Sequence, residues 1–151
     1  MIRRAKEEDY QGLQNIKPSI SESTIKERLQ AQAVGRVEFL VLKNSDKLVS
    51  FVLLKWGGKK THPNYPDMED LYTMESERGK GFGSQLVAEC ERLTKLKGLD
   101  KIGLAVNPTL NKPAKRLYEK LGYKPDGNPS YIDGVYDGVE DWCIDMEKSL
   151  K

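Results

Sequence analysis

A glycine-rich segment is the part of this chain whose residue types are best suited to binding a ligand. It consists of Arg78, Gly79, Lys80, Gly81, Phe82, Gly83 and Ser84. Glycines let the backbone curl tightly, and they place no Cβ atom in the way of a ligand. The segment lies between a predicted strand and a predicted helix, so free N–H groups at the helix start would face an anion, assisted by the helix dipole. The spacing therefore predicts a pyrophosphate site built from the backbone of residues 78–84.

Three kinds of phosphate-binding turn can be compared with this segment. A Walker A loop requires Ser or Thr after its lysine, but Lys80 is followed by Gly81. A dinucleotide fingerprint requires GxGxxG, whereas the glycines here occupy every second position. The pattern that fits is Arg-x-x-Gly-x-Gly, formed by Arg78, Gly81 and Gly83. The alternative is a bare helix N-terminus, although glycines there lower stability unless they have a use.

A second motif follows further along the chain. Residues 111–123 read Asn-x-x-Ala-x-x-Leu-Tyr-Glu-x-Leu-Gly-Tyr. Together with the preceding Arg-x-x-Gly-x-Gly, this pattern resembles the GCN5-related N-acetyltransferase family. The opening Ile2-Arg3-x-Ala5-x-x-x-Asp9, with Leu13, is similar to the usual start of that family. The resemblance extends from residue 2 to about residue 146 and is strongest over residues 71–123.

The resemblance implies a role for each matching position. Backbone groups near Met74 would contact the pantetheine arm of acetyl-CoA, and backbone N–H groups of residues 78–84 would hold its pyrophosphate. Asn111 would contact the pantetheine or acyl end. Tyr118 would face the thioester sulfur as general acid. A core aromatic is the alternative for Tyr118, because it shares the apolar helical spacing of its neighbours.

A general base is harder to assign. The family often places a carboxylate on the strand before the turn, where this chain has Glu69, Asp70 and Glu75. Glu69 is the candidate base, although each of the three can equally be a solvated strand end. The implied reaction moves an acetyl group from acetyl-CoA to a primary amine by direct attack, without a metal. Two alternatives stay open: a catalytically silent coenzyme A-binding module that acts as a sensor or interaction protein, and a nucleotide-binding protein that uses the same turn.

The segment after the second motif departs from the pattern of peptide-acetylating members of the family. Lys124 is its only basic residue up to position 145, against the acids Asp126, Asp133, Asp137, Glu140, Asp141 and Asp145. An acidic loop beside the acceptor would attract a cationic amine. A solvated hairpin that uses Asp-Gly for turn geometry explains the composition equally well. The loop at residues 57–70 would form the other side of the acceptor groove, with Tyr65 and His62 as walls.

The elements that would position these residues alternate between strands and helices. Expected strands cover residues 2–5, 37–42, 48–56, 71–74, 102–106 and 142–146, with a turn at 44–46 and loops at 57–66 and 123–139. Helices are expected at 10–16, from about 23 or 24 to 33, from the glycine turn to about 96, and at 114–121. Thr24 with Glu27 suggests a capping box, and Asn111 a helix N-cap. The order predicts an α/β (α+β) fold, a mixed β-sheet flanked by helices in one domain over residues 1–151, which is the acyl-CoA N-acyltransferase fold of the family.

Composition narrows the class of protein further. The 151 residues are 38% hydrophobic and 32% charged, with a net charge of +2, which does not indicate a nucleic-acid partner. No apolar run suggests a membrane span or signal peptide, so a cytoplasmic location is expected. His62 is the only histidine, and Cys90 and Cys143 are isolated, so no metal site is predicted. The acceptor is expected to be a small-molecule or peptide amine, and the chain a monomer or homodimer.

Overall fold

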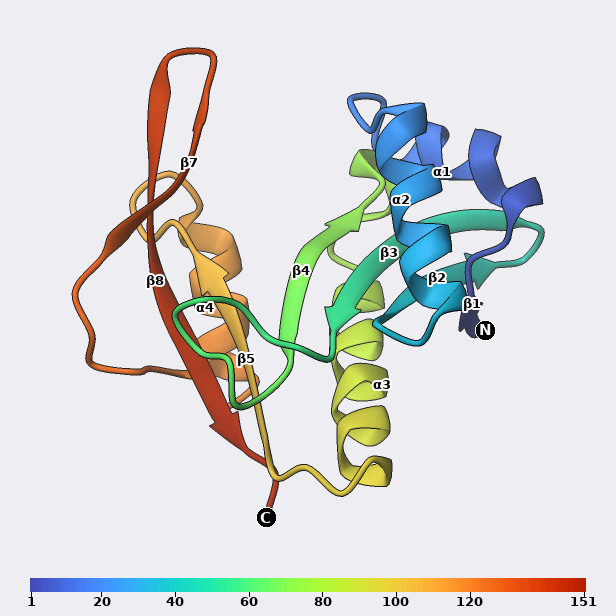
Figure 1. Cartoon of the computed structure of the whole chain (residues 1–151). Coiled ribbons are helices and arrows are strands. Elements are labelled where there is room, and N and C mark those ends of the chain that lie inside the picture. Colours follow the sequence, from blue (N-terminus) through green and yellow to red (C-terminus); the bar gives the residue numbers. More distant parts are fainter.

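The computed structural model describes all 151 residues and contains one mixed sheet with helices on both of its faces (Figure 1). The strands are β1 (Ile2–Arg4), β2 (Val37–Asn44), β3 (Lys47–Lys55), β4 (Asp67–Thr73), β5 (Lys101–Val106), β6 (Lys124–Pro125), β7 (Tyr131–Tyr136) and β8 (Val139–Ser149). The helices are α1 (Tyr10–Ile16), α2 (Glu22–Ala33), α3 (Phe82–Leu96) and α4 (Lys112–Lys120), with short 3-10 turns at Glu7–Asp9 and Glu75–Glu77. None of the helices is long and apolar enough to cross a membrane.

The sheet has the strand order β1-β2-β3-β4-β5-β8-β6, and β7 pairs with β8 as a projecting hairpin (Figure 1). All neighbouring strands are antiparallel except β4 and β5, which are parallel. Between β4 and β5 the chain passes through the glycine-rich turn and α3, as the crossover between parallel strands requires. Each of the two sequence motifs therefore follows one strand of the parallel pair, the glycine-rich turn after β4 and the second motif after β5.

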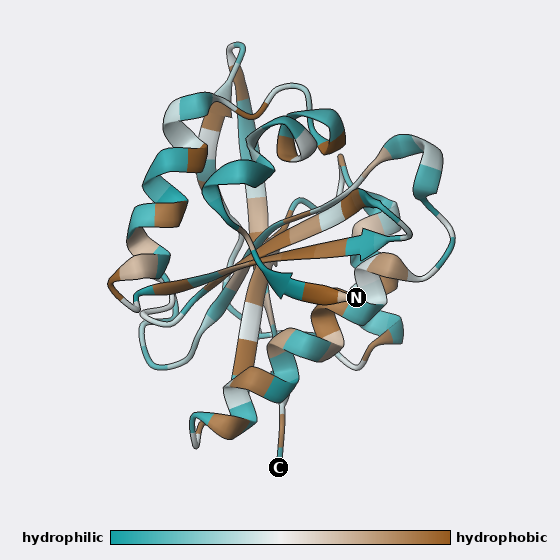
Figure 2. Cartoon of the chain, turned by 90° about the vertical axis from the view of Figure 1, so that its right-hand side faces the viewer, coloured by the Kyte–Doolittle hydropathy of each residue, from teal (hydrophilic) through white to brown (hydrophobic).

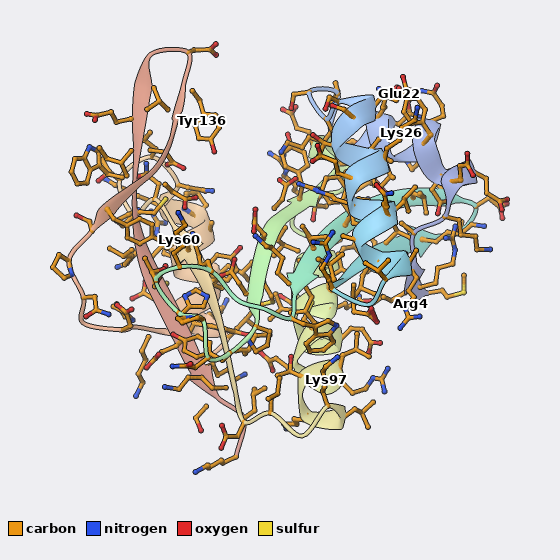
Figure 3. All side chains as sticks on the ribbon, viewed as in Figure 1. Arg4, Glu22, Lys26, Lys60, Lys97 and Tyr136 are labelled. Atoms are coloured by element: carbon orange, nitrogen blue, oxygen red, sulfur yellow. The ribbon has the colours of Figure 1, made fainter.

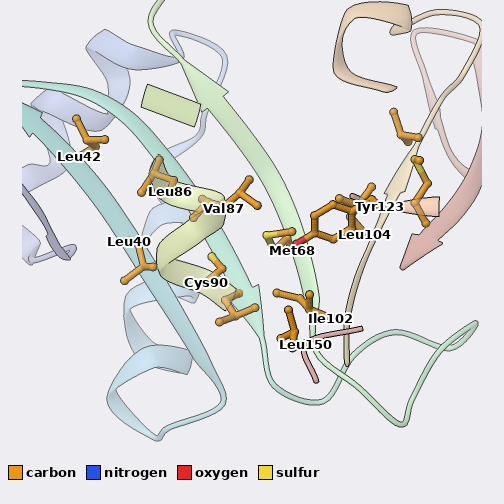
Figure 4. Packing of buried hydrophobic residues seen from close by; sticks show 14 of the residues in the cluster. Leu40, Leu42, Met68, Leu86, Val87, Cys90, Ile102, Leu104, Tyr123 and Leu150 are labelled. Carbon is orange, nitrogen blue, oxygen red and sulfur yellow. The ribbon is translucent and has the colours of Figure 1, made fainter. Parts of the chain in front are cut away.

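Alternating side chains of the central strands form two separate cores. Leu40, Leu42 and Val52 belong to one cluster with Leu86 and Cys90 of α3. Figure 4 shows Leu40 and Leu42 on the same side of the sheet as Leu86 and Cys90. The opposite face packs against α1 and α2 through a second cluster that comprises Leu13, Ile16, Ile25, Phe39, Val41 and Phe51. The hydropathy colouring agrees, since apolar residues fill the central strands and polar residues line the outer sides of the helices (Figure 2). Cores on both faces make the middle of the sheet a rigid support.

The parallel pair separates almost as soon as it forms. Only Asp67 and Met68 of β4 pair with β5, opposite Gly103 and Leu104. β4 then continues to Thr73 without a strand on its β5 side, while β5 stays paired with β8 to Val106. The sheet is therefore split between β4 and β5, with one edge of β4 unpaired.

Several expected elements are confirmed. The turn at residues 44–46 joins β2 to β3, with Ser45 in the left-handed region at φ 58°. Asn111 caps α4, since its side-chain oxygen accepts a hydrogen bond from Ala114 N–H at 3.4 Å.

The expected start of α2 was wrong: its N-cap is Ser21, whose Oγ accepts a hydrogen bond from Thr24 N–H at 3.1 Å. Thr24 therefore lies inside the helix and does not form a capping box with Glu27.

Two strand predictions also need correction. β4 begins at Asp67, four positions before the expected start. Its first residues were not expected in a strand because several of them are acidic, yet they pair with β3. The region 123–139 was expected to be a loop but contains β6 and β7. The last strand, expected to begin at residue 142, begins at Val139. β7 leaves Val135 and Tyr136 exposed, so it has no buried apolar alternation from which to predict it.

Candidate functional site

A two-lobed groove occupies the split between β4 and β5. One lobe has a volume of about 590 Å³ and is lined by residues 77–79 and 81–84 of the glycine-rich segment and by the first turns of α4. The other lobe has a volume of about 640 Å³ and lies toward α1, α2 and the β7–β8 hairpin. Leu71, Tyr72, Asn111, Ala114 and Tyr118 line both lobes, which makes the groove continuous at their position. We call the two parts the turn lobe and the hairpin lobe.

The turn lobe is floored by unpaired backbone N–H groups. The first helical hydrogen bond of α3 runs from Gln85 N–H to the Gly81 carbonyl oxygen at 3.1 Å, and the N–H groups of residues 79–84 have no acceptor in the protein. Gly81 is the N-cap at φ 84°, a conformation that L side chains rarely adopt. A Cβ atom at Gly79 or Gly81 would meet nothing within 4 Å, so the space beside them is open. This cradle fits a pyrophosphate, because consecutive N–H donors and the positive end of a helix converge on it.

The side chains of the glycine-rich segment point in different directions. Arg78 Nε donates to the Thr73 carbonyl oxygen at 3.0 Å, and its guanidinium lies 5.1 Å from the centre of the Tyr72 ring. Lys80 Nζ lies 3.0 Å from a Glu77 carboxylate oxygen at the surface. Phe82 is half-buried against the core. Arg78 therefore ties the turn to the end of β4, and the backbone forms the anion site.

Tyr118 lies at the junction of the two lobes. Its ring packs on the core and makes an edge contact with Tyr123 at 6.2 Å between ring centres, so the core-aromatic interpretation holds for the ring. Its hydroxyl has no hydrogen-bond partner in the protein, whereas the buried Tyr123 hydroxyl donates to Glu91 at 2.8 Å. Burial, together with the negative charges of Asp67 and Asp70, raises the pKa of Tyr118 to about 12. The phenol is therefore a protonated donor with no acceptor of its own.

Two asparagines shape the loop before α4. Asn111 lines both lobes, and with its oxygen engaged in capping its amide NH₂ group remains available as a donor. Asn107 accepts hydrogen bonds from Thr109 and Leu110 N–H at 3.1 and 2.9 Å and donates to Asp141 at 2.8 Å. Asn107 was not among the predicted site residues, and its signal in the sequence is an Asx turn directly after a strand. It fixes the loop that carries Asn111 to β8.

The structure does not bring Met74 to the groove. Met74 N–H donates to the Val49 carbonyl oxygen at 2.8 Å, and its own carbonyl accepts from Glu77 N–H at 2.9 Å. Its side chain packs on the α1–α2 face of the sheet. Tyr72 and Thr73, two positions that sequence reasoning missed, line the turn lobe instead. Tyr72 and Thr73, rather than Met74, are therefore the residues near the end of β4 that border the turn lobe.

Glu69 lines the hairpin lobe and also a second pocket beside α2. Its carboxylate is 3.2 Å from Lys55 Nζ, and its side chain is 46% exposed. Glu75 is exposed in the turn after β4 and lines neither lobe. Asp70 has φ 54° and lies in the region of β4 where the pairing with β3 shifts register. A positive φ in a non-glycine strand residue is costly and often marks a functional site.

His62 is buried and does not form a wall of the groove. Its Nε2 lies 2.9 Å from Asp67 Oδ1 and its Nδ1 lies 3.1 Å from Asp145 Oδ2. Each ring nitrogen thus faces a carboxylate oxygen. Burial lowers the pKa of His62, but the hydrogen bonds to Asp67 and Asp145 outweigh burial and raise that pKa, which favours the imidazolium. Tyr65 stacks on His62 with ring centres 4.6 Å apart and lines neither lobe. The expectation that His62 and Tyr65 form a wall was therefore wrong, whereas Lys59 of the same loop does line the hairpin lobe.

The acidic segment is less uniform than its composition suggests. Asp145 is buried in the His62 network, and Asp126 accepts hydrogen bonds from Asn128. Asp137 lies at the exposed tip of the β7–β8 hairpin. Asp133 and Asp141 line the hairpin lobe, together with Tyr136, Lys59 and Cys143. Figure 3 shows Tyr136 projecting from the hairpin toward the side of α1 and α2.

The sequence and the fold of this chain resemble those of known proteins. A family model described as "Acetyltransferase (GNAT) family" matches residues 2–123. No curated protein sequence matches this chain. The chain is similar in structure to ribosomal-protein-alanine N-acetyltransferase from Brucella melitensis, with a TM-score of 0.82, 17% identity and 99% coverage of both chains.

Two further solved structures share the fold. An N-acetyltransferase from Staphylococcus aureus Mu50 has a TM-score of 0.80 and 22% identity, and the alignment covers 100% of this chain and 98% of that one. yncA from Salmonella typhimurium, solved with its cofactor acetyl-CoA, has a TM-score of 0.78 and 16% identity, with coverage of 100% and 94%. At these identities the similarity establishes the fold.

Proposed function

The chain belongs to the acetyltransferase (GNAT) family, and on that premise we propose that it transfers the acetyl group of acetyl-CoA to a primary amine in a ternary complex. In this proposal residues 1–151 act as one catalytic domain. The observation that carries it is the free Tyr118 hydroxyl at the junction between a backbone anion cradle and a second, polar lobe. The turn lobe would hold the coenzyme and the hairpin lobe the acceptor.

The residues of the turn lobe suit the pyrophosphate, the pantetheine arm and the acyl end of the coenzyme. N–H groups of residues 79–84 would bind the pyrophosphate, and the unpaired edge of β4 at Tyr72 and Thr73 would lie along the pantetheine arm. The Asn111 amide would donate to a carbonyl near the acyl end. When bound, acetyl-CoA supplies an acetyl group activated as a thioester. The positioned donors would hold this group next to the hairpin lobe in a fixed orientation.

Proton transfers set the demands on the protein. The neutral amine attacks the thioester carbonyl, which forms the C–N bond and breaks the C–S bond. The nitrogen loses one proton as the amide forms, besides the proton that an ammonium must lose before attack, and the departing thiolate is protonated by solvent. A lysine-like amine is protonated at pH 7, and reaching its neutral form costs roughly 4.6 kcal/mol. Glu69 is our candidate for accepting that proton, through solvent, because it is a carboxylate on the hairpin lobe. Its side chain is 46% exposed, so water can reach the carboxylate.

Tyr118 acts in this proposal as a hydrogen-bond donor to the leaving sulfur. A coenzyme A thiol has a pKa near 8.5, so full transfer of the phenolic proton from a group with a pKa of about 12 would be uphill by roughly 5 kcal/mol. Donation of a hydrogen bond as negative charge develops on sulfur still lowers the barrier, because the donor is already in place. The raised pKa therefore argues for stabilisation by Tyr118 over complete protonation.

The acceptor is a small-molecule or peptide amine that reaches the groove as a cation. Among the residues of the hairpin lobe, carboxylates outnumber cations, and Asp133 and Asp141 form its side opposite α2. Such a surface attracts an ammonium group and then holds it beside Tyr118. The acceptor amine is thus expected to enter between the β7–β8 hairpin and β4.

A thiol-release assay tests the proposal. Purified protein is mixed with acetyl-CoA and a panel of primary amines, and free coenzyme A is measured over time. Release that depends on an amine supports the acetyltransferase. Tight coenzyme A binding without release for any amine would instead favour the catalytically silent module, and ATP affinity without coenzyme A affinity would favour a nucleotide-binding protein. Calorimetric titrations of both ligands accompany the assay.

A further inference from the structure

The wall of the hairpin lobe formed by α1 and α2 carries two cations around one carboxylate. Lys17 Nζ lies 2.7 Å from Asp70 Oδ1, and Arg28 Nη2 lies 3.0 Å from Asp70 Oδ2. All three side chains are largely buried, with exposed fractions of 26%, 14% and 18% in the order Lys17, Arg28 and Asp70. Asp70 can neutralise only one of the two cations, so this wall keeps an excess positive charge at low exposure.

Arg28 is the less satisfied of the two cations. Its Nη1 is the single buried side-chain nitrogen or oxygen in the chain that lacks a hydrogen-bond partner. The guanidinium is held in place by the Phe39 ring, whose centre is 5.4 Å away, and by Asp70 on one side. A charged donor that is buried without an acceptor is unfavourable, and in native structures an ordered water or a bound group usually satisfies it.

The position of Arg28 relates this unsatisfied donor to the acceptor. Arg28 lies between two pockets: it lines the hairpin lobe together with Tyr118, and it also lines the second pocket beside α2. Asp133 and Asp141 line the hairpin lobe from β7 and β8. Figure 1 shows α2 and the β7–β8 hairpin on opposite sides of β4, so the charges of opposite sign lie on opposite walls. A molecule that carries an ammonium group and an anionic group would satisfy both walls at once.

We propose that the acceptor is a primary amine that also carries a carboxylate, and that Arg28, with Lys17 beside it, binds this carboxylate. The inference rests on the proposed acetyl transfer and specifies its substrate class. A carboxylate suits the site because the guanidinium presents paired donors to planar oxygens. Since Asp70 already balances one cation, the remaining charge matches a singly charged carboxylate better than a doubly charged phosphate.

The test compares amino acids with their own amides as acceptors. Each pair keeps the amine and the side chain and differs only in the carboxylate. With saturating acetyl-CoA, we expect the wild-type kcat/KM to be at least about tenfold higher for the acid than for the amide. In Arg28→Gln the value for the acid should fall by about 10- to 100-fold, the range for losing a charged hydrogen bond. The value for the amide should fall by a clearly smaller factor, because the amide has no carboxylate for Arg28 to bind.

Controls separate recognition from a structural role. Arg92→Gln on α3 removes a surface arginine that pairs with Glu89, and it should leave both values unchanged. An equal fall for acid and amide in Arg28→Gln would overturn the inference and make Arg28 only a clamp on Asp70. A wild-type preference for amides, or for aminoalkyl phosphonates over amino acids, would overturn it as well. If Arg28→Gln does not fold, the wild-type ratio of acid to amide and its change in Arg28→Lys decide the question.

The result also distinguishes this inference from the proposed function. Amine-dependent thiol release without a preference for carboxylates would remove the inference and leave the acetyltransferase standing. An absence of release with every amine, despite coenzyme A binding, would remove both.

Discussion

The phenol of Tyr118 is the side chain on which the proposed chemistry depends most. In Tyr118→Phe the ring still packs against Tyr123 and the core, but the donor to sulfur is lost. We expect kcat to fall by roughly 10- to 1000-fold, with little change in the KM for acetyl-CoA. Steady-state kinetics on both proteins measure this split. A variant that turns over like the wild type would show that Tyr118 serves only as a core aromatic.

His62 gives a second prediction at this scale, which concerns stability. Burial alone would lower the pKa of His62, but hydrogen bonds from its ring to Asp67 and Asp145 outweigh burial and raise that pKa. A group whose pKa is raised on folding contributes stability that is fully present below its unfolded pKa, near 6.5, and is lost as the pH rises through the folded value. The free energy of unfolding should therefore decline from pH 6 toward alkaline pH.

Urea unfolding of the wild type and of His62→Gln between pH 6 and pH 9 measures this contribution. The variant leaves two buried carboxylates without their cation, so it should be less stable by about 3 kcal/mol at pH 6. The difference should shrink as the pH rises, because the wild-type ring loses its charge. A gap that stays constant across this range would contradict a charged His62.

Residue chemistry was predictable from the sequence only where neighbours in the chain decide it. The position of Asn111 as an N-cap follows from the residues next to it, and the structure confirms it. The burial of His62 depends on Asp145, which lies 83 positions away, and no local pattern reports that contact. Arg28 and Asp70 are likewise brought together by the packing of α2 on the sheet. Long-range pairs of this kind were the part of the site that the sequence could not give.

At the scale of elements, the connection from β4 through the turn to α3 is the feature that creates the anion cradle. Gly83 is the best position at which to test it, because its φ is not positive and an added Cβ would make ordinary contacts, 3.7 Å from Leu71 at the nearest. Gly81→Val is less informative, since φ 84° would strain any side chain there. We expect Gly83→Val to weaken coenzyme A binding by about tenfold or more while the fold stays intact.

Calorimetric titration of coenzyme A measures the effect, and thermal unfolding checks the fold. Gly57→Val is the matched control, since that glycine lies away from the turn, has no positive φ and would meet nothing within 4 Å. Equal affinity in the Gly83 variant and the wild type would move the pyrophosphate away from this turn. Replacing a helical glycine also removes a residue that disfavours the helix, so stability should not fall.

Elements with a buried apolar period were predictable, and those without one were not. α3 ends before Gly98 as expected, because its apolar stripe is regular and faces the sheet. The start of β4 was missed because Asp67 and Glu69 are acidic, whereas their strand is defined by pairing with β3. β7 was expected to be a loop because its residues show no buried apolar alternation. In the structure β7 is a strand that pairs with β8 and is mostly exposed. The overall fold prediction is nevertheless confirmed by the solved structures that share it.

At the scale of the whole molecule, the net charge of +2 says little about which partners reach the groove. What matters is that the cations near the groove are paired or lie on the α2 side, while Asp133 and Asp141 lie on the hairpin side. A field arranged within a cleft steers a ligand even when the total charge is small. The sequence indicated an acidic segment, but the fold decides which of its acids face the cleft.

Asp133 is the acid whose neutralisation tests this arrangement most directly. Asp133 lines the hairpin lobe beside Lys59, whereas Asp137 lies at the exposed hairpin tip and lines neither lobe. We expect Asp133→Asn to raise the KM for a primary amine by about 3- to 10-fold and to spare acetyl-CoA binding, because one attractive charge near the ammonium is lost. Asp137→Asn is the matched control, and it should change neither value, since asparagine also tolerates the positive φ of this turn.

The dependence of the KM for the amine on salt concentration tests the role of Asp133 independently. Charges attract over about 8 Å at physiological ionic strength, so added salt should raise the KM for the amine in the wild type. The rise should be smaller in Asp133→Asn, because less attraction remains to be screened, and uncharged acceptors should show almost none. Steady-state kinetics at low and high salt measure all three. An identical salt response in the wild type and Asp133→Asn would mean that the hairpin acids are solvated and that the amine is held by Tyr118, β4 and the α2 wall alone.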